Sequence, residues 1–332
     1  MIDRSSASLA CAAKDVAWIA AAVIATASGS ALAQTYPSRL VRIVVAFPPG
    51  GVPDILARVL AKEMQTSLGQ TVVVDNRPGN AGLIGADAVA KAPPDGYTLL
   101  SGSTSLAIAP ALYSRLPFDP RKDLAPVSAI ARSGNVLLVH PRLPVKNVKD
   151  LIVLAKARPG EMNFGSAGNG SSNHLSSAML NQMAGINVRH VPYKGDAPAL
   201  TDVAAGQIEM MFASVPLAVA YAKAGKIRML AVTTPQRLTL LPEVPTLAES
   251  GVPRYDFSTW YGLFSTGGTD STVVTVLARE TKKAFESAEA KSQLAGLGVE
   301  EILNSPADFR KLFNDDIDKF AALAKSIGLS LD

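Results

Sequence analysis

The sequence predicts an α/β fold, because short apolar strands alternate with amphipathic helices along most of its 332 residues. Two observations support this: some strands are apolar without a break, as in parallel sheets buried on both faces, and glycine-rich turns join strands to helices. Hydrophobic residues make up 48% of the chain and charged residues 18%, so the chain is too apolar to be disordered. We expect about two domains of ordinary size.

The first predicted unit is a strand, a glycine turn and a helix. Residues 40–47 form the strand, Pro48-Pro49-Gly50-Gly51 ends it, and a helix from about Asp54 carries one apolar stripe up to a cap at Gly69. The alternation then continues along the chain. We expect strands over residues 71–75, 97–101, 162–166, 188–193, 208–212 and 227–232, and helices over 82–92, 147–158, 172–184, 197–205 and 217–224.

The last part of the chain is predicted to be helical. Ser305 and Asp308 form a capping box before regularly spaced apolar residues. Asn147 and Gly185 mark the start and end of two earlier helices in the same way.

Two extended stretches, residues 127–140 and 256–265, do not fit the winding of a single sheet. A self-contained α/β block lies between them. This predicts that one lobe is inserted into another through two crossing strands. We expect residues 34–131 and 258–332 to form lobe 1 and residues 132–257 to form lobe 2.

The first 33 residues are typical of an export signal. An apolar run over residues 16–25 is followed by Ala31-Leu32-Ala33, a small-x-small cleavage site. The run is too short for a permanent anchor, since a spanning helix needs about 20 apolar residues. Cleavage after Ala33 removes the single cysteine, Cys11, and with it any disulfide or catalytic thiol.

Charge and motifs exclude several functions. The 32 Lys and Arg residues against 28 Asp and Glu give a net charge of +4 without a basic run, so we expect no nucleic-acid partner. The three histidines lack metal-ligand spacing, and no phosphate loop or nucleophile elbow occurs, so we expect no metal, cofactor or catalysis. A secreted α/β hydrolase is the weaker alternative. No heptad pattern is present, and we expect a monomer.

Three loops share one design, in which small residues lie between a strand end and a helix start. They span residues 48–54, 101–105 and 166–174. Such loops bind anions, because unpaired N–H groups and the positive end of the helix dipole point at the ligand. Ordinary turns and caps are the alternative for any single loop. Since ligands bind at the carboxyl ends of strands, loops from two lobes would face each other across a cleft.

Four charged or titratable residues near these loops have two possible roles. His174 begins a helix beside the third loop and is a candidate ligand contact. His140 and His190 lie at strand ends, where a structural role is expected. Arg77 could bind a carboxylate, although pairing with a neighbouring loop is the more ordinary role for an arginine in a tight turn.

Eight segments resemble the Bordetella uptake gene (Bug) proteins, the periplasmic solute-binding components of tripartite tricarboxylate transporters. The likeness runs in the same order from about residue 36 to the C-terminus. The segments are Tyr36–Ser38, Phe47–Gly51 with Asp54, Asn76–Gly79, Pro94–Thr98, Asn163–Gly170, His190–Gly195, Ala231–Thr233 and Pro242–Thr246.

The resemblance implies a two-lobed periplasmic binding protein of type II-like fold that closes on a small carboxylate and presents it to membrane permease subunits. A di- or tricarboxylate, an acidic amino acid or an aromatic acid would fit. A sensor that docks on a receptor kinase is an open alternative. The expected ligand-binding residues are Phe47, Gly50, Gly51, Val52, Asp54, Ser103, Thr104, Ser105, Ala167, Gly168, Asn169, Ser171, Ser172, His174, Ala213 and Ser214.

Two departures from the family pattern bear on the ligand. Val52 stands where relatives often have Ser or Thr, which removes a hydroxyl from the first loop. Ala213 stands where relatives often have Asp, so a carboxylate that could accept a ligand amine is absent at that position. The sequence therefore predicts a ligand without an amine, with an apolar or aromatic body against Val52.

Overall fold

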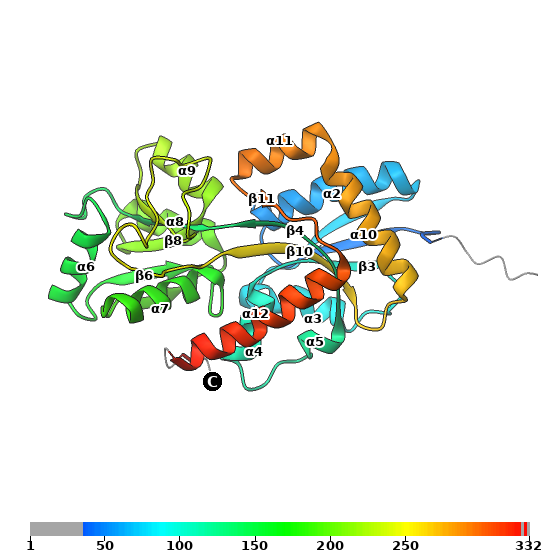
Figure 1. Ribbon diagram of the computed structural model, residues 1–332, viewed down its shortest axis with the longest axis horizontal. Helices are drawn as coiled ribbons and strands as arrows, with labels where there is room; N and C mark the ends of the chain where they lie inside the picture. The colour runs from blue at the N-terminus through cyan, green and yellow to red at the C-terminus, as the bar shows by residue number, and fades with distance from the viewer. Residues whose placement is uncertain (1–35, 327–328, 331–332) are drawn as a thin grey trace, which may run out of the picture. The chain divides into compact units, whose positions relative to one another are not determined.

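Two β-sheets organise the protein in the computed structural model, which describes residues 36–326, 329 and 330 (Figure 1). Among these residues, the first sheet has six strands in the order β11 (Glu300–Glu301), β4 (Leu124–Ser133), β10 (Thr259–Thr266), β3 (Thr98–Ser103), β1 (Val41–Val45) and β2 (Val72–Asn76). The second has five, in the order β7 (Arg189–Pro192), β6 (Asn163–Ser166), β8 (Met210–Ser214), β5 (Asn135–Val139) and β9 (Arg228–Val232). Each sheet is the centre of one lobe, and the predicted two-lobed α/β fold is confirmed.

Helices cover both faces of each sheet. In the first lobe, α2 packs against α10, and α4 packs against α12 on the other face (Figure 1). The first-lobe helices are α2 (Val52–Leu68), η1 (Asn80–Gly82), α3 (Leu83–Ala90), α4 (Ser105–Leu112), α5 (Pro120–Asp123), α10 (Ser271–Glu286), α11 (Ala288–Leu297) and α12 (Pro306–Ser326). The second-lobe helices are α6 (Val148–Ala157), α7 (Ser172–Ala184), α8 (Asp196–Ala205) and α9 (Val215–Lys223).

The first unit forms for the reasons that the sequence indicates. Strand β1 pairs in parallel with β2 and β3, so its apolar residues are buried between helices on both faces. Helix α2 ends at Leu68, and Gly69 follows in the left-handed region with φ of 64°. Its N–H bonds to the carbonyl of Gln65, which satisfies one of the last carbonyls of the helix.

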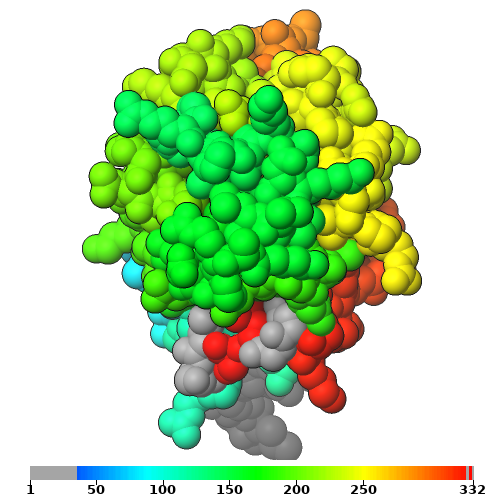
Figure 2. Space-filling model, turned by 90° about the vertical axis from the view of Figure 1, so that its left-hand side faces the viewer, coloured from blue at the N-terminus to red at the C-terminus, as the bar shows by residue number. Residues whose placement is uncertain are grey.

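Two connections join the lobes. Strand β4 of the first sheet leads through Gly134 directly into β5 of the second. The return connection runs from Thr233 to Ser258, which is yellow in Figure 2 and forms part of the surface of the second lobe. It ends where the N–H of Phe257 bonds to the carbonyl of Thr233, 2.9 Å away. The lobe boundaries at residues 131/132 and 257/258 stay a prediction.

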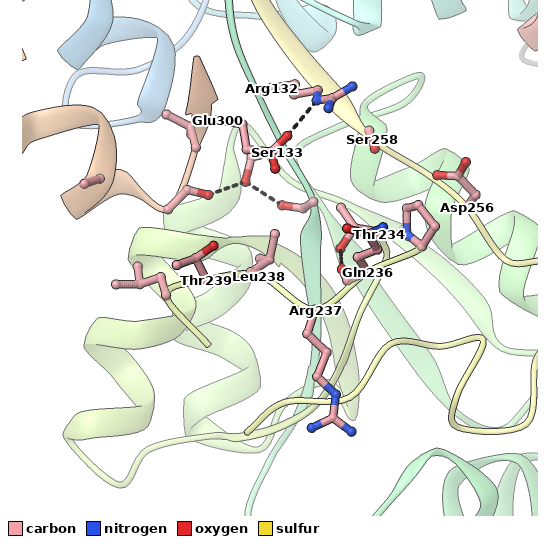
Figure 3. A pocket seen from close by; sticks show the side chains of 16 residues that line it. Arg132, Ser133, Thr234, Gln236, Arg237, Leu238, Thr239, Asp256, Ser258 and Glu300 are labelled. Carbon is pink, nitrogen blue, oxygen red and sulfur yellow. Dashed lines mark hydrogen bonds and ion pairs between the residues drawn. The ribbon is translucent and has the colours of Figure 1, made fainter. Parts of the chain in front are cut away.

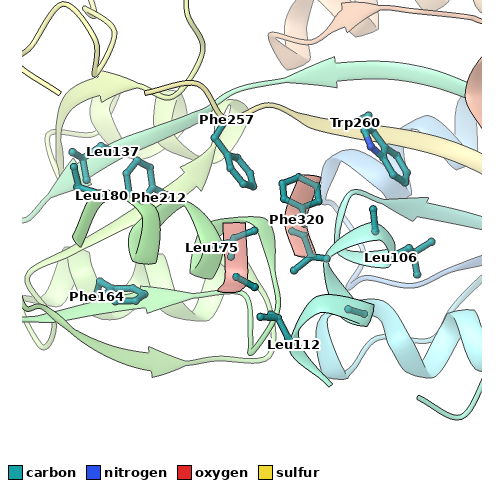
Figure 4. Close-up of a cluster of buried hydrophobic side chains, with 14 of the residues drawn as sticks. Leu106, Leu112, Leu137, Phe164, Leu175, Leu180, Phe212, Phe257, Trp260 and Phe320 are labelled. Carbon is teal, nitrogen blue, oxygen red and sulfur yellow. The ribbon is translucent and has the colours of Figure 1, made fainter. Parts of the chain in front are cut away.

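The last helix, α12, lies along the connections between the lobes. The Phe320 ring on α12 and the Phe257 ring lie 5.7 Å apart between centroids, and they point toward each other in Figure 4. At the end of α12, the Gln182 amide of α7 donates to the carbonyl of Ser326 at 2.8 Å. A helix that packs on the first sheet thus also contacts the second lobe.

Candidate functional site

A cavity of about 280 Å³ lies between the lobes, at the ends of strands and the starts of helices. Connecting loops and the crossing strands form its wall, as expected for ligand sites of α/β sheets. The first lobe contributes Phe47–Pro53, Ser103, Ser105, Thr259 and Tyr261, and the second contributes Asn135, Ala167, Ser171–Asn173, Gly195–Pro198, Ser214 and Leu217.

The two lobes touch beside this cavity. Gly195 of the second lobe packs against Pro48 of the first, and a Cβ at position 195 would lie 3.1 Å from Pro48 Cγ. A Cβ on Gly168 would similarly lie 3.8 Å from the backbone nitrogen of Ala81 and 3.2 Å from the carbonyl oxygen of Tyr193. Both glycines have positive φ, of 129° and 126°, which also favours glycine there. The two lobes are therefore in direct contact at this edge of the cavity.

The first predicted loop lines the cavity with Phe47, Gly50, Gly51 and Val52, but Asp54 does not line it. The Asp54 carboxylate is 2% exposed and accepts hydrogen bonds from the Gly50 N–H, the Arg58 guanidinium and the Asn76 amide, each at 2.9 Å. Burial acts to raise the pKa of Asp54, but these hydrogen bonds outweigh it and hold the pKa below its usual value. Asp54 fixes the shape of the loop.

The second loop brings Ser103 and Ser105 to the cavity, with their hydroxyl oxygens 3.1 Å apart. Thr104 does not line it. Its hydroxyl instead accepts from the Trp260 N–H at 2.8 Å, and its own N–H donates to the Trp260 carbonyl at 3.1 Å. Thr104 therefore joins the serine loop to β10.

The third loop contributes Ala167, Ser171 and Ser172, whereas Gly168, Asn169 and His174 do not line the cavity. The Ser171 hydroxyl accepts from the backbone N–H of residue 174 and so caps α7, whose bounds match the predicted helix over residues 172–184.

His174 is part of a buried histidine pair. Its ring stacks on that of His190 with centroids 3.8 Å apart, and its Nδ1 accepts from the Gly170 N–H at 3.2 Å. The Nε2 of His190 lies 2.6 Å from the Ser166 hydroxyl. Burial lowers the pKa of His174 to about 4, and burial together with the neighbouring His174 lowers that of His190 to about 3. Both rings are neutral at pH 7 and hold the third loop in place.

A fourth loop, which the sequence analysis did not single out, runs from β7 to α8 and lines the cavity with Gly195–Pro198. It has the same pattern of strand, glycine and helix start as the first three, and this pattern was the available signal. Among the residues that the structure describes, Asp196 in this loop is the one residue lining the cavity that has a charged side chain. Ala213, the position at which the sequence lacks a carboxylate, is buried and does not line the cavity, whereas Asp196 brings a carboxylate to it from another loop.

The crossing strands also contribute residues that the sequence analysis missed. Thr259 of β10 is 3% exposed, and its hydroxyl finds no hydrogen-bond partner within the described part of the chain. Such a group costs free energy unless something else bonds to it. Tyr261, two residues later, also lines the cavity. Burial, and to a smaller extent the nearby Asp196 charge, raises the pKa of its phenol.

Arg77 and His140 lie outside the residues that line the cavity. Arg77 pairs with Asp75 at 2.9 Å. His140 Nδ1 accepts from the N–H of Arg142 at 3.2 Å, a local contact that fits the structural role expected for it.

A second, larger cavity of about 560 Å³ adjoins the crossings, but none of the glycine or serine loops reaches it (Figure 3). Its two arginines are engaged, Arg132 with Glu300 at 2.8 Å and Arg237 with Glu249 at 2.9 Å. Figure 3 shows Arg132 beside Glu300 and Arg237 pointing away from both. We therefore place the candidate site in the smaller cavity.

No helix in residues 36–326 is both long and apolar enough to cross a membrane. Within the same part of the chain, no three His, Cys, Asp or Glu residues are grouped as metal ligands would be. The predicted signal, with its cleavage after Ala33, lies outside the described residues.

Comparison with known proteins identifies the family. The profile described as tripartite tricarboxylate transporter family receptor matches residues 56–329. The chain is 37% identical to protein BugT of Bordetella pertussis over 301 residues, which is 90% of this chain and 92% of BugT.

Two solved structures share the fold. An R. palustris protein with adipate superposes with a TM-score of 0.85 at 38% identity, over 89% of this chain and 100% of that one. MatC from Rhodopseudomonas palustris with bound malate gives 0.82 at 29% identity, over 87% and 99%. The chain therefore belongs to the tripartite tricarboxylate transporter receptor family, a family of solute receptors and not of enzymes, as the sequence predicted.

Proposed function

We propose that this protein is an exported receptor that binds a small organic acid in the cavity between its lobes and delivers it to the membrane subunits of a tripartite tricarboxylate transporter. The observation that carries the binding role is Thr259: this residue lines the cavity, and its buried hydroxyl has no partner among the described residues. A hydrogen bond from this hydroxyl to a ligand carboxylate would satisfy it.

The groups around Thr259 suit a carboxylate. Helix α2 begins at the cavity with Gly51 as its N-cap, and no side chain caps it. The positive end of its dipole favours an anion here in addition to Asp54, which lies in its first turn. The hydroxyls of Ser103 and Ser105 come from the same lobe. The carboxylate is thus held by neutral donors, because no Lys, Arg or His lines the cavity in the described structure.

The remaining wall suits the body of the acid. Phe47, Val52 and Leu217 present apolar surface from both lobes. Because the two lobes supply different parts of the site, a ligand that contacts both stabilises the closed arrangement by its greater affinity for that state. The relatives with adipate and malate support acids of this size class.

Binding can be tested on the full chain, exported by a bacterial host, purified from the periplasm and freed of carried-over ligand. Isothermal titration with mono-, di- and tricarboxylates and aromatic acids should find one acid class that saturates one site. We expect Thr259→Val to weaken that acid about tenfold, since one net hydrogen bond to a charged group is lost. Thr201→Val is the matched control, because the Thr201 hydroxyl bonds to its own helix at the Ala197 carbonyl.

No saturable binding by any acid, or equal affinity of Thr259→Val and the unchanged protein, would contradict the proposed site. Delivery is tested separately. Deleting the gene should abolish cellular uptake of the acid that binds, and uptake that persists without it would contradict the transport role. The mass of the periplasmic protein should correspond to a chain that begins at Gln34.

A further inference from the structure

Asp196 is an unusual group for a site that takes an anion. It is the one residue with a charged side chain among those lining the cavity in the described structure. A carboxylate ligand would therefore share the cavity with a second negative charge. Two like charges in such a site repel each other, and the repulsion is strongest where water is excluded.

The surroundings of Asp196 show what its carboxylate does. Asp196 is the first residue of α8, and its Oδ2 accepts the N–H of Ser214, the N-cap residue of α9, at 3.2 Å. Neither helix has a capping side chain at its N-cap position. One carboxylate thus lies at the N-termini of two helices, which both favour a negative charge.

The other groups near Asp196 are uncharged. The Asn173 side chain hydrogen-bonds to it, and the phenol of Tyr261 lies close enough to feel its charge. Burial raises the pKa of Asp196, and the bonds from Ser214 and Asn173 act against that shift. No cation of the chain is paired with this carboxylate in the described structure.

We propose that Asp196 is a specificity-determining residue: it supplies the protein's own anion at the α8 and α9 helix starts, so that the receptor selects an acid with one carboxylate over an acid with a carboxylate at each end. This inference rests on the proposed function, in which the ligand carboxylate binds beside Thr259 and the start of α2. Asp196 comes from the second lobe, whereas the groups assigned to the ligand carboxylate come from the first, so the far end of the ligand would lie at Asp196. A neutral or cationic far end is compatible with that contact, and a second carboxylate is not.

Three six-carbon probes test the inference at pH 7.5: hexanoate, adipate and 6-aminohexanoate, which differ only at the far end. Isothermal titration should show adipate binding at least tenfold more weakly than hexanoate. Asp196→Asn keeps the shape and an oxygen for the Ser214 N–H but removes the charge. It should strengthen adipate binding about tenfold, leave hexanoate within about threefold and weaken 6-aminohexanoate relative to hexanoate.

Asp202→Asn is the matched control, because Asp202 lies on the same helix and its carboxylate accepts from the Tyr193 hydroxyl at 2.6 Å. It should not change the order of the three probes. If the unchanged protein binds adipate as tightly as hexanoate, or if Asp196→Asn leaves the adipate-to-hexanoate ratio unaltered, the inference is overturned while the proposed function stands. If no organic acid binds to either protein, the proposed function fails and the inference fails with it.

Discussion

Asp54 and Asp196 occupy equivalent places in the two lobes and do different work. Each follows a glycine turn after a strand and lies in the first turn of a helix, α2 or α8. Asp54 bonds to Gly50 in its own loop and to a cation, Arg58, and it is turned away from the cavity. Asp196 bonds to the start of another helix, pairs with no cation within the described residues and lines the cavity. Aspartate in the same local pattern therefore shapes a loop in one lobe and lines the cavity in the other, and the difference follows from its hydrogen-bond and ion-pair partners.

Acid also affects the stability of the folded protein through the stacked pair of His174 and His190. The pKa of His174 is lowered from 6.5 to about 4 in the folded protein, so the unfolded chain takes up its proton first as the pH falls. This stability is complete above pH 6.5 and is lost between pH 6.5 and about 4, at most about 3 kcal/mol for one group.

Urea unfolding at pH 7 and pH 5 should show this acid loss in the unchanged protein and a smaller loss in His174→Asn. His140→Asn is the control, since His140 lies outside the stacked pair. An acid loss of the same size in His174→Asn would show that the pair does not cause it.

Asp54→Asn tests the structural role of the first-lobe aspartate. All three partners of the carboxylate are donors, and an amide has one acceptor oxygen, so at least one donor is left without an acceptor. We expect the free energy of unfolding at pH 7 to fall by about 2 kcal/mol and acid binding to weaken at least tenfold.

Asp95→Asn serves as the reference for Asp54→Asn in the same denaturant experiment. Asp95 pairs with Arg39 at the surface, and surface pairs contribute about 0–1 kcal/mol. Equal effects of the two substitutions would remove the special role of Asp54.

Asp196→Asn should leave stability within about 1 kcal/mol at pH 7, because no cation loses its partner and the amide oxygen can still accept from Ser214. The measurement is again denaturant unfolding, with Asp202→Asn beside it. A loss as large as that of Asp54→Asn would mean that Asp196 has the same structural role as Asp54, and the contrast between the lobes would disappear.

Lowering the pH should change the contributions of the two aspartates to folding stability in opposite directions. The pKa of Asp54 is lowered, so its stabilisation is present above pH 3.8 and is lost as the pH falls through the folded pKa. The pKa of Asp196 is raised, so the folded protein takes up its proton first and gains stability as the pH falls through that value toward 3.8. Asn173, Ser214 and the phenol of Tyr261 face this group, and none of them titrates in that range.

Thermal unfolding from pH 7 to pH 3.5 should therefore show the advantage of the unchanged protein over Asp54→Asn shrinking with acid. Relative to Asp196→Asn, the unchanged protein should improve with acid. The same trend for both variants would contradict the assigned pKa directions.

Local patterns in the sequence predict much of this fold because the chemistry that ends each element is local. The cap at Gly69, the capping serine at Ser171 and the bounds of α7 all follow from residues within a few positions. The loop design predicts a helix start after residues 101–105, but the extent of α4 was not predicted, because its residues are apolar on all sides and Pro110 interrupts them, so it shows no amphipathic stripe.

The candidate site was predictable in part for the same reason. Glycine and serine loops are visible in a sequence, and Gly51, Ser103 and Ser172 lie at the cavity as expected. Long-range partners decide the rest. The Thr104 hydroxyl bonds to the Trp260 N–H, 156 positions away in the sequence, and the His174 ring stacks on that of His190, so neither side chain lines the cavity. Thr259 reaches the cavity only because β10 pairs with β3 and β4, and no local pattern reports that pairing.

The place of β10 has a consequence for how the protein is assembled during synthesis and export. The second sheet takes all its strands from one continuous stretch of chain, so that lobe can complete itself early. The first sheet cannot, because β10 lies between β4 and β3 and follows the whole second lobe in the sequence. Long-range pairings of this kind form late, since the intervening chain must first be ordered. The cavity needs Thr259 from β10 as well as Ser214 from β8, so the receptor becomes able to bind its solute only in the last stage of its own folding.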